Sequence, residues 1–372
     1  MSKVKLCDIC DFQGGSQPPK SQWITLQQDG YIRMLQIRDF TQPGKVKAEY
    51  VKLTNTTKCC LKDDILIARY GASLGKILTG LSGAYNVAMT KAVPNEAVIS
   101  KKFLYYFLCS DTFQNCILNV GVRAAQAGFN KEDLSNIELY CPDLSIQNKI
   151  CKILELVDVL INKSNLQLDE LDLLVKSRFI EMFGESNYPL VKACDVCDFI
   201  TKGTTPNTKE IYENYTDERI PFLKVYNLSN TGKLLFKNKT QYIDNSVHNG
   251  ELSRSIVFPN DVLMNIVGPP LGKFALVDDS FPEWNVNQAI AIFRAKREIL
   301  PLYLLYSLMQ DDILSPFLQK AVGVRQLNIS LEQCRELQFR LPPLNLQHNF
   351  SVFAQQVDKS KLAIQQSLDE LE

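Results

Sequence analysis

The chain has 372 residues, the length of two average domains, and 45% of them are hydrophobic, which is enough for two cores. Its 41 basic and 41 acidic side chains cancel, so no overall positive field draws the protein to nucleic acid or to a membrane surface. No apolar run approaches the length of a transmembrane helix, and the N-terminus shows no charged-then-apolar leader. We therefore expect a cytoplasmic protein of two units with no membrane partner.

Two cysteine pairs are the first local feature. Cys7 and Cys10 stand in "LCDICDF", and Cys194 and Cys197 stand in the similar string "ACDVCDF". A zinc ribbon needs its two pairs about 15–20 residues apart, and here they lie in different halves of a chain with only two histidines. The alternating apolar pattern predicts a short structural strand at each pair, with metal binding and thiol redox chemistry as alternatives. We expect no metal and no cofactor.

A Gly/Pro-rich turn follows each cysteine pair, "FQGGSQPP" at 12–19 and "FITKGTTP" at 199–206. The next matching segments, 62–76 and 259–273, read as a strand, a glycine turn and a second strand. A nucleotide-binding P-loop has four residues between its glycines, whereas "GASLGK" and "GPPLGK" have three. A glycine turn with cations suits a DNA phosphate contact, and a plain hairpin with surface lysines is the alternative. The candidate DNA contacts here are Arg69, Ser73, Lys76 and Lys273.

Polar side chains gather in the second part of each repeat, where "YNVAM" (85–89) matches "WNVNQ" (284–288) and "GVRAAQ" (121–126) matches "GVRQLN" (323–328). Asn, Gln and Arg are the side chains that pair with base edges through two hydrogen bonds, although each is also an ordinary loop residue. The candidate DNA-binding residues are Asn86, Arg123, Gln126, Asn285, Asn287, Gln288, Arg325, Gln326 and Asn328.

Helices close each repeat. An apolar helix is expected near 101–118 and again near 301–319, and a long terminal helix starts after "CPDL" and after "PPLN". Apolar residues spaced three and four apart predict a coiled-coil seam on both long helices. The seam residues are Ile146, Ile150, Ile153, Val157, Leu168, Leu171, Leu346, Phe350, Phe353, Val357, Ile364 and Leu368. We expect the two helices to pair with each other; local packing within each unit or self-association are the alternatives.

The sequence shows no catalytic signature. A metal-dependent nuclease needs clustered carboxylates with a lysine or a histidine-rich motif, and a methyltransferase acting on base amino groups needs an Asn/Asp-Pro-Pro-aromatic motif. Neither pattern is present. We therefore expect no catalytic residue, and a protein that binds rather than an enzyme.

The order of these parts, together with the junction "LVKSRFIEMFGE" at 174–185, resembles the specificity subunit of type I restriction–modification systems over the whole chain. The resemblance implies an α+β protein with two target-recognition domains that read a bipartite, asymmetric site in double-stranded DNA. It also implies an antiparallel coiled coil of the two long helices, two modification subunits docked on them, and a restriction and motor subunit.

The domain boundaries expected on this basis are 1–143 and 187–343 for the recognition domains, and 144–186 and 344–372 for the helical spacers. A two-repeat helical adaptor that binds protein and not DNA is the alternative function.

Overall fold

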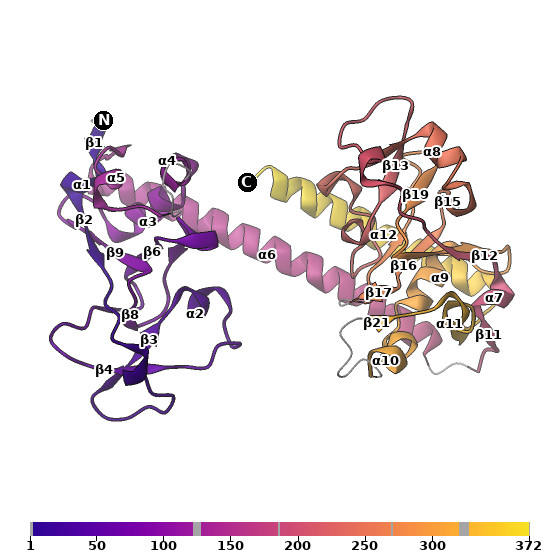
Figure 1. The fold of residues 1–372 in the computed structure, drawn as a ribbon, viewed down its shortest axis with the longest axis horizontal. Coiled ribbons are helices and arrows are strands. Elements are labelled where there is room, and N and C mark those ends of the chain that lie inside the picture. The colour runs from indigo at the N-terminus through magenta and orange to yellow at the C-terminus, as the bar shows by residue number, and fades with distance from the viewer. Residues whose placement is uncertain (1–2, 122–127, 185–186, 269–270, 320–326, 372) are drawn as a thin grey trace. The chain divides into compact units, whose positions relative to one another are not determined.

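The computed structural model describes residues 3–121, 128–184, 187–268, 271–319 and 327–371 (Figure 1). The chain forms two compact units, residues 1–160 and 161–372. Each unit combines short strands with helices around its own hydrophobic cores.

Unit 1 contains two four-stranded sheets and a two-stranded one among its described residues. The first sheet consists, in spatial order, of β2 (Cys10–Gly14), β9 (Met89–Pro94), β6 (Ile65–Ala68) and β7 (Ile77–Leu78). The second consists of β4 (Tyr50–Lys52), β3 (Tyr31–Leu35), β8 (Gly83–Tyr85) and β5 (Cys59–Cys60). The third pairs β1 (Lys3–Lys5) with β10 (Glu138–Tyr140).

Unit 2 repeats this topology in its described part. Its first sheet consists of β12 (Cys197–Lys202), β20 (Ile290–Ala295), β16 (Val262–Asn265) and β18 (Phe274–Leu276). Its second consists of β14 (Tyr242–Asp244), β13 (Arg219–Leu223), β19 (Trp284–Val286) and β15 (Ile256–Val257). The two-stranded pairs are β11 (Leu190–Lys192) with β22 (Gln338–Arg340), and β17 (Val267–Gly268) with β21 (Leu327–Asn328). The internal repeat expected from the sequence is thus a repeat of structure.

The helices also repeat. Unit 1 holds α1 (Leu6–Ile9), α2 (Ile37–Thr41), α3 (Lys101–Cys109), α4 (Asp111–Gly121) and α5 (Lys131–Leu134). Unit 2 holds α7 (Ala193–Val196), α8 (Asn245–Asn249), α9 (Pro301–Leu308), α10 (Asp311–Gln319), α11 (Leu331–Arg335) and α12 (Leu344–Asp369). The long helix α6 (Leu144–Phe183) begins in unit 1 and ends in unit 2.

Two kinds of sequence prediction were wrong in detail in both units. The single helices expected near 101–118 and 301–319 are each divided in two, into α3 and α4 and into α9 and α10. The strands expected at the cysteine pairs begin only at the second cysteine of each pair, Cys10 and Cys197. The single helix expected over 101–118 is broken at Ser110, whose backbone is extended and whose hydroxyl donates to the carbonyl of Phe107 at 2.7 Å. The strand expected at the first cysteine pair starts only at Cys10, because Leu6–Ile9 form one helical turn. That turn buries Leu6 and Ile9, three positions apart, on the same side.

Buried glutamines join the terminal helix of each unit to the preceding helix. The Oε1 atom of Gln147 accepts a hydrogen bond from the backbone N–H of Ser100 at 2.8 Å, and that of Gln347 accepts one from Leu300 at 2.8 Å. Each amide also donates to a proline carbonyl at 2.8 Å, that of Pro142 in the first case. Both side chains are fully buried, so each glutamine fixes where α3 or α9 starts relative to the long helix.

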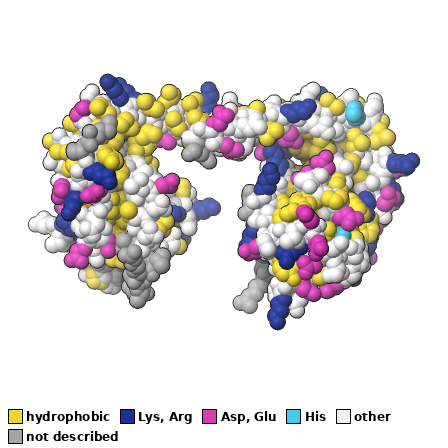
Figure 2. Space-filling model, turned by 90° about the horizontal axis from the view of Figure 1, so that it is seen from above, with side chains coloured by type: hydrophobic (Ala, Val, Ile, Leu, Met, Phe, Trp, Pro, Cys, Tyr) yellow, Lys and Arg dark blue, Asp and Glu magenta, His cyan; other side chains and the backbone are white. Residues whose placement is uncertain are grey.

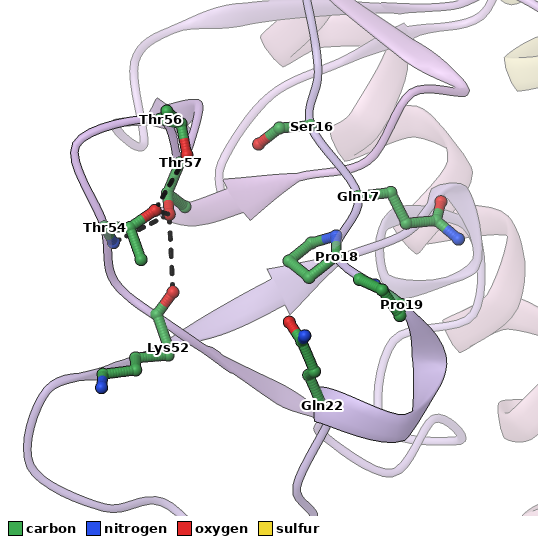
Figure 3. Close-up of a pocket in the computed structure, with 9 residues that line it drawn as sticks. All are labelled: Ser16, Gln17, Pro18, Pro19, Gln22, Lys52, Thr54, Thr56 and Thr57. Carbon is green, nitrogen blue, oxygen red and sulfur yellow. Dashed lines mark hydrogen bonds between the residues drawn. The ribbon is translucent and has the colours of Figure 1, made fainter.

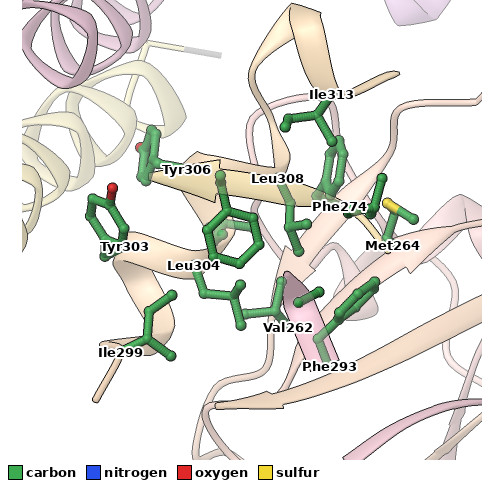
Figure 4. Packing of buried hydrophobic residues seen from close by; sticks show 14 of the residues in the cluster. Val262, Met264, Phe274, Phe293, Ile299, Tyr303, Leu304, Tyr306, Leu308 and Ile313 are labelled. Carbon is green, nitrogen blue, oxygen red and sulfur yellow. The ribbon is translucent and has the colours of Figure 1, made fainter. Parts of the chain in front are cut away.

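The core of unit 2 lies between α9 and the first sheet. Figure 4 shows Leu304 of α9 pointing toward Val262 of β16. Leu308, Met264 and Phe293 pack in the same cluster, all of them fully buried. Complete burial of one such side chain is worth about 1.5–3 kcal/mol, so this layer holds the sheet in place beneath its loops.

In unit 2, α12 runs antiparallel to the second half of α6. Phe350, near the start of α12, contacts Phe179 with ring centroids 5.2 Å apart, while Lys361, further along α12, pairs with the earlier residue Asp172. The predicted seam residues have different environments. The buried ones are Phe350, Val357 and Leu368; the half-buried ones are Ile146, Ile150, Val157, Leu168, Leu171, Leu346, Phe353 and Ile364; Ile153 is exposed.

Candidate nucleic-acid interface

In each unit, a glycine of the Gly/Pro-rich turn packs against the backbone of an asparagine, Asn86 in unit 1 and Asn287 in unit 2. We call the position of this asparagine the corner. The N–H of Gly15 donates to the carbonyl of Met89 at 3.1 Å, and a Cβ added at Gly15 would lie 2.1 Å from the carbonyl oxygen of Asn86. In unit 2, a Cβ at Gly203 would lie 2.4 Å from the carbonyl oxygen of Asn287. Only glycine fits this approach, which explains why both turns begin with it.

The corner itself follows a parallel strand pair. β8 pairs with β3 through Tyr85 opposite Leu35, and the next residue, Asn86, donates its N–H to the carbonyl of Leu35 at 3.3 Å. In unit 2, Asn287 donates to the carbonyl of Leu223 at 3.0 Å. The structure therefore equates Asn86 with Asn287, two positions beyond the sequence match, which had aligned Asn86 with Asn285.

Asn285, one of the candidate base contacts, lies in the core. It is fully buried, and its amide donates to the carbonyls of Leu252 at 3.3 Å and Ser255 at 3.2 Å. Its Oδ1 meets Nδ1 of the buried His248, whose Nε2 lies 2.9 Å from the Glu283 carboxylate. Asn285 thus ties α8 to β19, and its side chain is not available at the surface.

Asn86 and Asn287 occupy equivalent corners of the two units, but their side-chain oxygens have different hydrogen bonding. The Oδ1 of Asn86 accepts from the N–H of Ala88 at 3.2 Å, a local turn contact. The Oδ1 of Asn287 is buried and has no hydrogen-bond partner within the described part of the chain. The neighbouring Gln288 has an exposed side chain, and its N–H donates to the hydroxyl of Thr205 at 3.3 Å.

The predicted hairpin turn lies beside this corner. The strands β6 and β7 pair as expected, and Gly71 and Gly75 between them have φ of +70° and +80°, values that favour glycine. Ser73 is half-buried in the turn, and Lys76 is exposed. In unit 2 the same turn contains Lys273, which is half-buried and donates its N–H to Oδ1 of Asn265 at 2.8 Å.

Arg69 anchors the turn instead of pointing freely to solvent. Its N–H donates to the carbonyl of Ala88 at 2.8 Å, which joins the hairpin to the asparagine corner. Its guanidinium donates twice to the carbonyl of Phe129 at 3.3 Å. Arg69 therefore holds the described segment that begins at Gly128 against the hairpin.

Backbone bridges join the segments that begin at Gly128 and at Leu327 to the hairpin of their unit. Tyr70 pairs with Gly128, and Val267 pairs with Asn328 in the equivalent position. Asn328 is exposed. The candidates Arg123, Gln126, Arg325 and Gln326 lie outside the described residues.

A polar pocket of about 400 Å³ opens beside the glycine turn of unit 1 (Figure 3). Threonine hydroxyls, amides, a lysine and two prolines line it: Ser16, Gln17, Pro18, Pro19, Gln22, Lys52, Thr54, Thr56 and Thr57. The hydroxyl of Ser16 accepts a hydrogen bond from the N–H of Lys58 at 2.9 Å. This contact joins the glycine turn to the segment 54–57, which we call the threonine loop. Hydroxyls, amides and lysine are the usual partners of DNA phosphates and sugars.

Sequence reasoning missed this pocket and also missed Arg254. The threonine loop differs between the two halves, so no repeated motif marked it. The exposed Arg254 donates from Nη2 to the hydroxyl of Thr204 at 3.0 Å and thereby brings a cation to the glycine turn of unit 2. The sequence offered one sign of this contact, the turn "GTTP" at 203–206, because its first threonine, Thr204, accepts the hydrogen bond from Arg254.

On the face that Figure 2 draws, basic charge does not form one patch, because Lys and Arg side chains are interspersed with Asp and Glu. Several lysines of unit 1 are paired, for example Lys101 with Asp63 at 2.7 Å and Lys20 with Glu49 at 2.6 Å.

The cysteine pairs have the properties of structural residues. Burial raises the pKa of the Cys10 and Cys197 thiols to about 12, which keeps both thiols protonated at neutral pH. Within the described residues, no group of three or more His, Cys, Asp or Glu side chains is arranged to hold a metal ion.

No helix in the described part of the chain is long and apolar enough to cross a bilayer.

Comparisons with known proteins agree with this architecture. The chain matches a solved structure described as "Structural basis underlying complex assembly and conformational transition of the type I R-M system", at 17% identity and TM-score 0.60, over 100% of this chain and 94% of that one. It also matches the S subunit of a type I restriction–modification system from M. genitalium, at 14% identity and TM-score 0.52, over 100% and 92%. At these identities the likeness shows the fold.

The family assignment comes from the sequence. The type I restriction modification DNA specificity domain matches residues 1–170 and again residues 185–372. The two matches cover almost the whole chain and coincide with the structural repeat. The protein therefore belongs to the family of DNA specificity subunits of type I restriction–modification systems.

Proposed function

We propose that this specificity subunit reads a split, asymmetric DNA site, with one half-site contacted by each unit. The observation that carries the proposal is the repeated corner. The same backbone, built on Gly15 and on Gly203, presents Asn86 with a satisfied side chain in one unit and Asn287 with an unpaired Oδ1 in the other. One scaffold with different side chains can read two different base strings.

The boundaries proposed for this division are those expected from the sequence. Residues 1–143 and 187–343 read DNA, and residues 144–186 and 344–372 form the helical spacer. The spacer carries two modification subunits, and the motor and restriction subunit joins that assembly; the solved complex of a type I system supports partners of this kind. The chain itself acts without a catalytic residue, and we place it in the cytoplasm with the DNA it reads.

Methylation mapping tests the division of labour. Residues 187–343 are replaced by the equivalent segment of another family member, the chimera is expressed with its modification subunits, and methylated sites are sequenced. We expect one half of the bipartite site to change and the other half to stay. A change in both halves would show that the units do not read independently.

The salt dependence of DNA binding separates this function from a protein-binding adaptor. Affinity that rests on phosphate contacts falls steeply with salt, because bound counterions are released. An adaptor joined to its partner by an apolar helix face would bind that partner almost equally well at low and high salt. Flat DNA binding between 50 and 200 mM salt, a range over which phosphate contacts lose orders of magnitude in affinity, would favour the adaptor.

A further inference from the structure

A buried histidine of unit 2 has a hydrogen-bond acceptor on each side of its ring. The side chain of His248 in α8 is fully buried. Its Nδ1 faces Oδ1 of Asn285 in β19, and its Nε2 lies 2.9 Å from a carboxylate oxygen of Glu283. An amide oxygen and an ionised carboxylate accept hydrogen bonds and cannot donate them. A neutral imidazole has a single N–H and would satisfy only one of these two oxygens.

The orientation of the Asn285 amide follows from its other partners. Its Nδ2 donates to the backbone carbonyls of Leu252 at 3.3 Å and Ser255 at 3.2 Å. A carbonyl oxygen only accepts, so the amide group that faces these two carbonyls is the NH2 group, and Oδ1 faces the histidine. The side chain of Glu283 is 39% exposed, and a carboxyl group in contact with water is ionised at neutral pH. The geometry therefore calls for a proton on both ring nitrogens of His248.

Other titratable groups lie on the elements that pack against α8, which are β13, β14 and a 3₁₀ turn, Ser253–Ser255. These groups are Arg219, Tyr242, Asp244 and Arg254. Arg219 and Asp244 pair with each other at 3.2 Å. Within the described part of unit 2, the hydrogen bonds of the His248 ring go to Asn285 and Glu283. Glu283 is therefore the carboxylate that balances the charge of the buried ring, as a buried cation requires.

The same hydrogen bonds position Arg254. The two carbonyls that accept from Asn285 flank this arginine, because they belong to Leu252 and Ser255. Arg254 is exposed, and its Nε and Nη2 donate to the hydroxyl of Thr204 in the glycine turn at 3.3 and 3.0 Å. Among the described residues, no carboxylate pairs with Arg254, so its remaining N–H groups are free to meet a DNA phosphate.

Unit 1 has a different arrangement at the equivalent place. In β8, Ala84 has the strand position that Asn285 has in β19. The connection between β4 and β5, residues 53–58, contains no histidine, whereas the connection between β14 and β15, residues 245–255, contains α8. The histidine contacts thus belong to unit 2, and unit 1 is an internal comparison.

We propose that His248 is a positioning residue that acts as a buried imidazolium. With both ring nitrogens protonated, it holds the 3₁₀ turn in the place where Arg254 contacts the glycine turn and binds a phosphate of the half-site of unit 2. The inference rests on the DNA-reading function proposed above. Loss of one proton leaves a bare ring nitrogen facing the Glu283 carboxylate, and two acceptors cannot form a hydrogen bond. The phosphate contact of Arg254 is therefore strongest at the lower pH, where the ring holds both protons.

Nitrogen NMR tests the protonation state. The chain has only two histidines, and the second, His348, is exposed, so labelling with nitrogen-15 histidine gives one probe and its reference. The spectrum is recorded at pH 7.5, about one unit above the pH at which an ordinary histidine loses its second proton. We expect both ring nitrogens of His248 to show the chemical shift of a protonated nitrogen, and His348 to show the shifts of a neutral ring.

Two glutamate variants test the cause. Glu283→Gln replaces the carboxylate by an amide that can donate to a bare ring nitrogen, so the shifts of His248 should approach those of His348. Glu251→Gln is the matched control, because Glu251 is an exposed glutamate on the same connection; it should leave the spectrum unchanged. Circular dichroism should show both variants folded, since both side chains reach the surface.

DNA binding tests the role of the proton. The full chain, in complex with its modification subunits, is titrated with a duplex that carries its mapped methylation site. The salt dependence is measured at pH 6.5 and at the higher pH where the NMR spectrum shows a neutral ring. Each phosphate contact contributes about 0.9 to the slope of log affinity against log salt concentration, so the slope should become shallower by that amount at the higher pH. Arg254→Ala should give the shallow slope at both pH values.

Three results would overturn the inference. They are a bare nitrogen on His248 at pH 7.5 in the parent chain, a salt slope that still depends on pH in Arg254→Ala, and equal spectra of Glu283→Gln and Glu251→Gln. The NMR measurement contains no DNA, so its failure would leave the DNA-reading function standing. Flat salt dependence at every pH would instead refute that function, and this inference with it.

Discussion

Lys361 of α12 and Asp172 of α6 form an ion pair inside unit 2, where the lysine side chain is only 4% exposed. Asp358, one turn earlier on α12, lies 3.3 Å from the same ammonium group. A buried ammonium group is costly unless it is paired. Asp358 belongs to the same helix as Lys361, but Asp172 belongs to α6, so the pair with Asp172 is the contact that favours one register of α12 against α6.

Substitutions at this ion pair should separate charge pairing from packing. Asp172→Ala leaves the buried ammonium with the half-exposed Asp358 alone, and should lower the free energy of unfolding by about 1–3 kcal/mol, because part of the lost pairing is screened by solvent. Lys361→Met keeps the volume of the stem without the charge and should be close to neutral. Urea unfolding measures both; equal losses would mean that the ion pair itself stabilises the fold, and that the effect is not only the cost of leaving a buried ammonium group unpaired.

The buried glutamines should be among the most sensitive polar positions. Gln147→Ala leaves the N–H of Ser100 unsatisfied and removes the hydrogen bonds donated to the carbonyls of Val98 and Pro142. The free energy of unfolding should therefore fall by about 2 kcal/mol or more. Gln347→Ala should act alike in unit 2. The control is Gln167→Ala on the exposed side of α6, and the comparison is made by urea unfolding. A loss no larger than that of the control would contradict the role assigned to Gln147.

The two corner asparagines should respond differently to truncation. Asn287→Ala removes an unpaired acceptor, so stability should not fall, while discrimination at one base pair of its half-site should drop by about 1–3 kcal/mol if the amide reads a base edge. Asn86→Ala removes the contact to Ala88 and should cost about 1 kcal/mol of stability. Methylation mapping with mismatched sites measures discrimination; uniform weakening over all sequences would assign Asn287 to the DNA backbone.

The more deeply a cysteine thiol is buried, the more slowly it should react with an alkylating reagent. The pKa values of Cys10, Cys197 and Cys334 are raised to about 12 by desolvation, so at pH 8 these groups are almost entirely thiols, and the fraction of reactive thiolate grows only as pH rises toward 12. The exposed Cys116 should react first. Mass-spectrometric mapping of iodoacetamide labelling checks the order.

The zinc alternative for the cysteine pairs has its own test. Cys7→Ser with Cys10→Ser should lower stability modestly, because Cys10 is buried, and should leave the methylated sequence unchanged. Elemental analysis of the purified protein should find no stoichiometric zinc. Zinc that is present in the parent and lost in this double variant would refute the structural assignment.

The sequence by itself determined the architecture. The glycine turns, the hairpins and the long helices with their seam are local patterns, and each occurs twice in the same order. Local backbone preference and apolar periodicity favour such elements independently of contacts with distant parts of the chain. The repeat, the α+β class and the family could therefore be predicted before any contact was known.

Tertiary structure alone decided which polar residues face outward. The sequence match aligned Asn86 with Asn285, but strand register moved the equivalence to Asn287 and placed Asn285 in the core. Asn285 lies within β19, where β13 and β15 pair with it on both sides, whereas Asn287, two residues later, follows the end of that strand. Register depends on the partner strands, which are distant in sequence. For the same reason, the threonine-lined pocket, the Arg254–Thr204 contact and the ring contacts of His248 became visible only when distant segments were brought together.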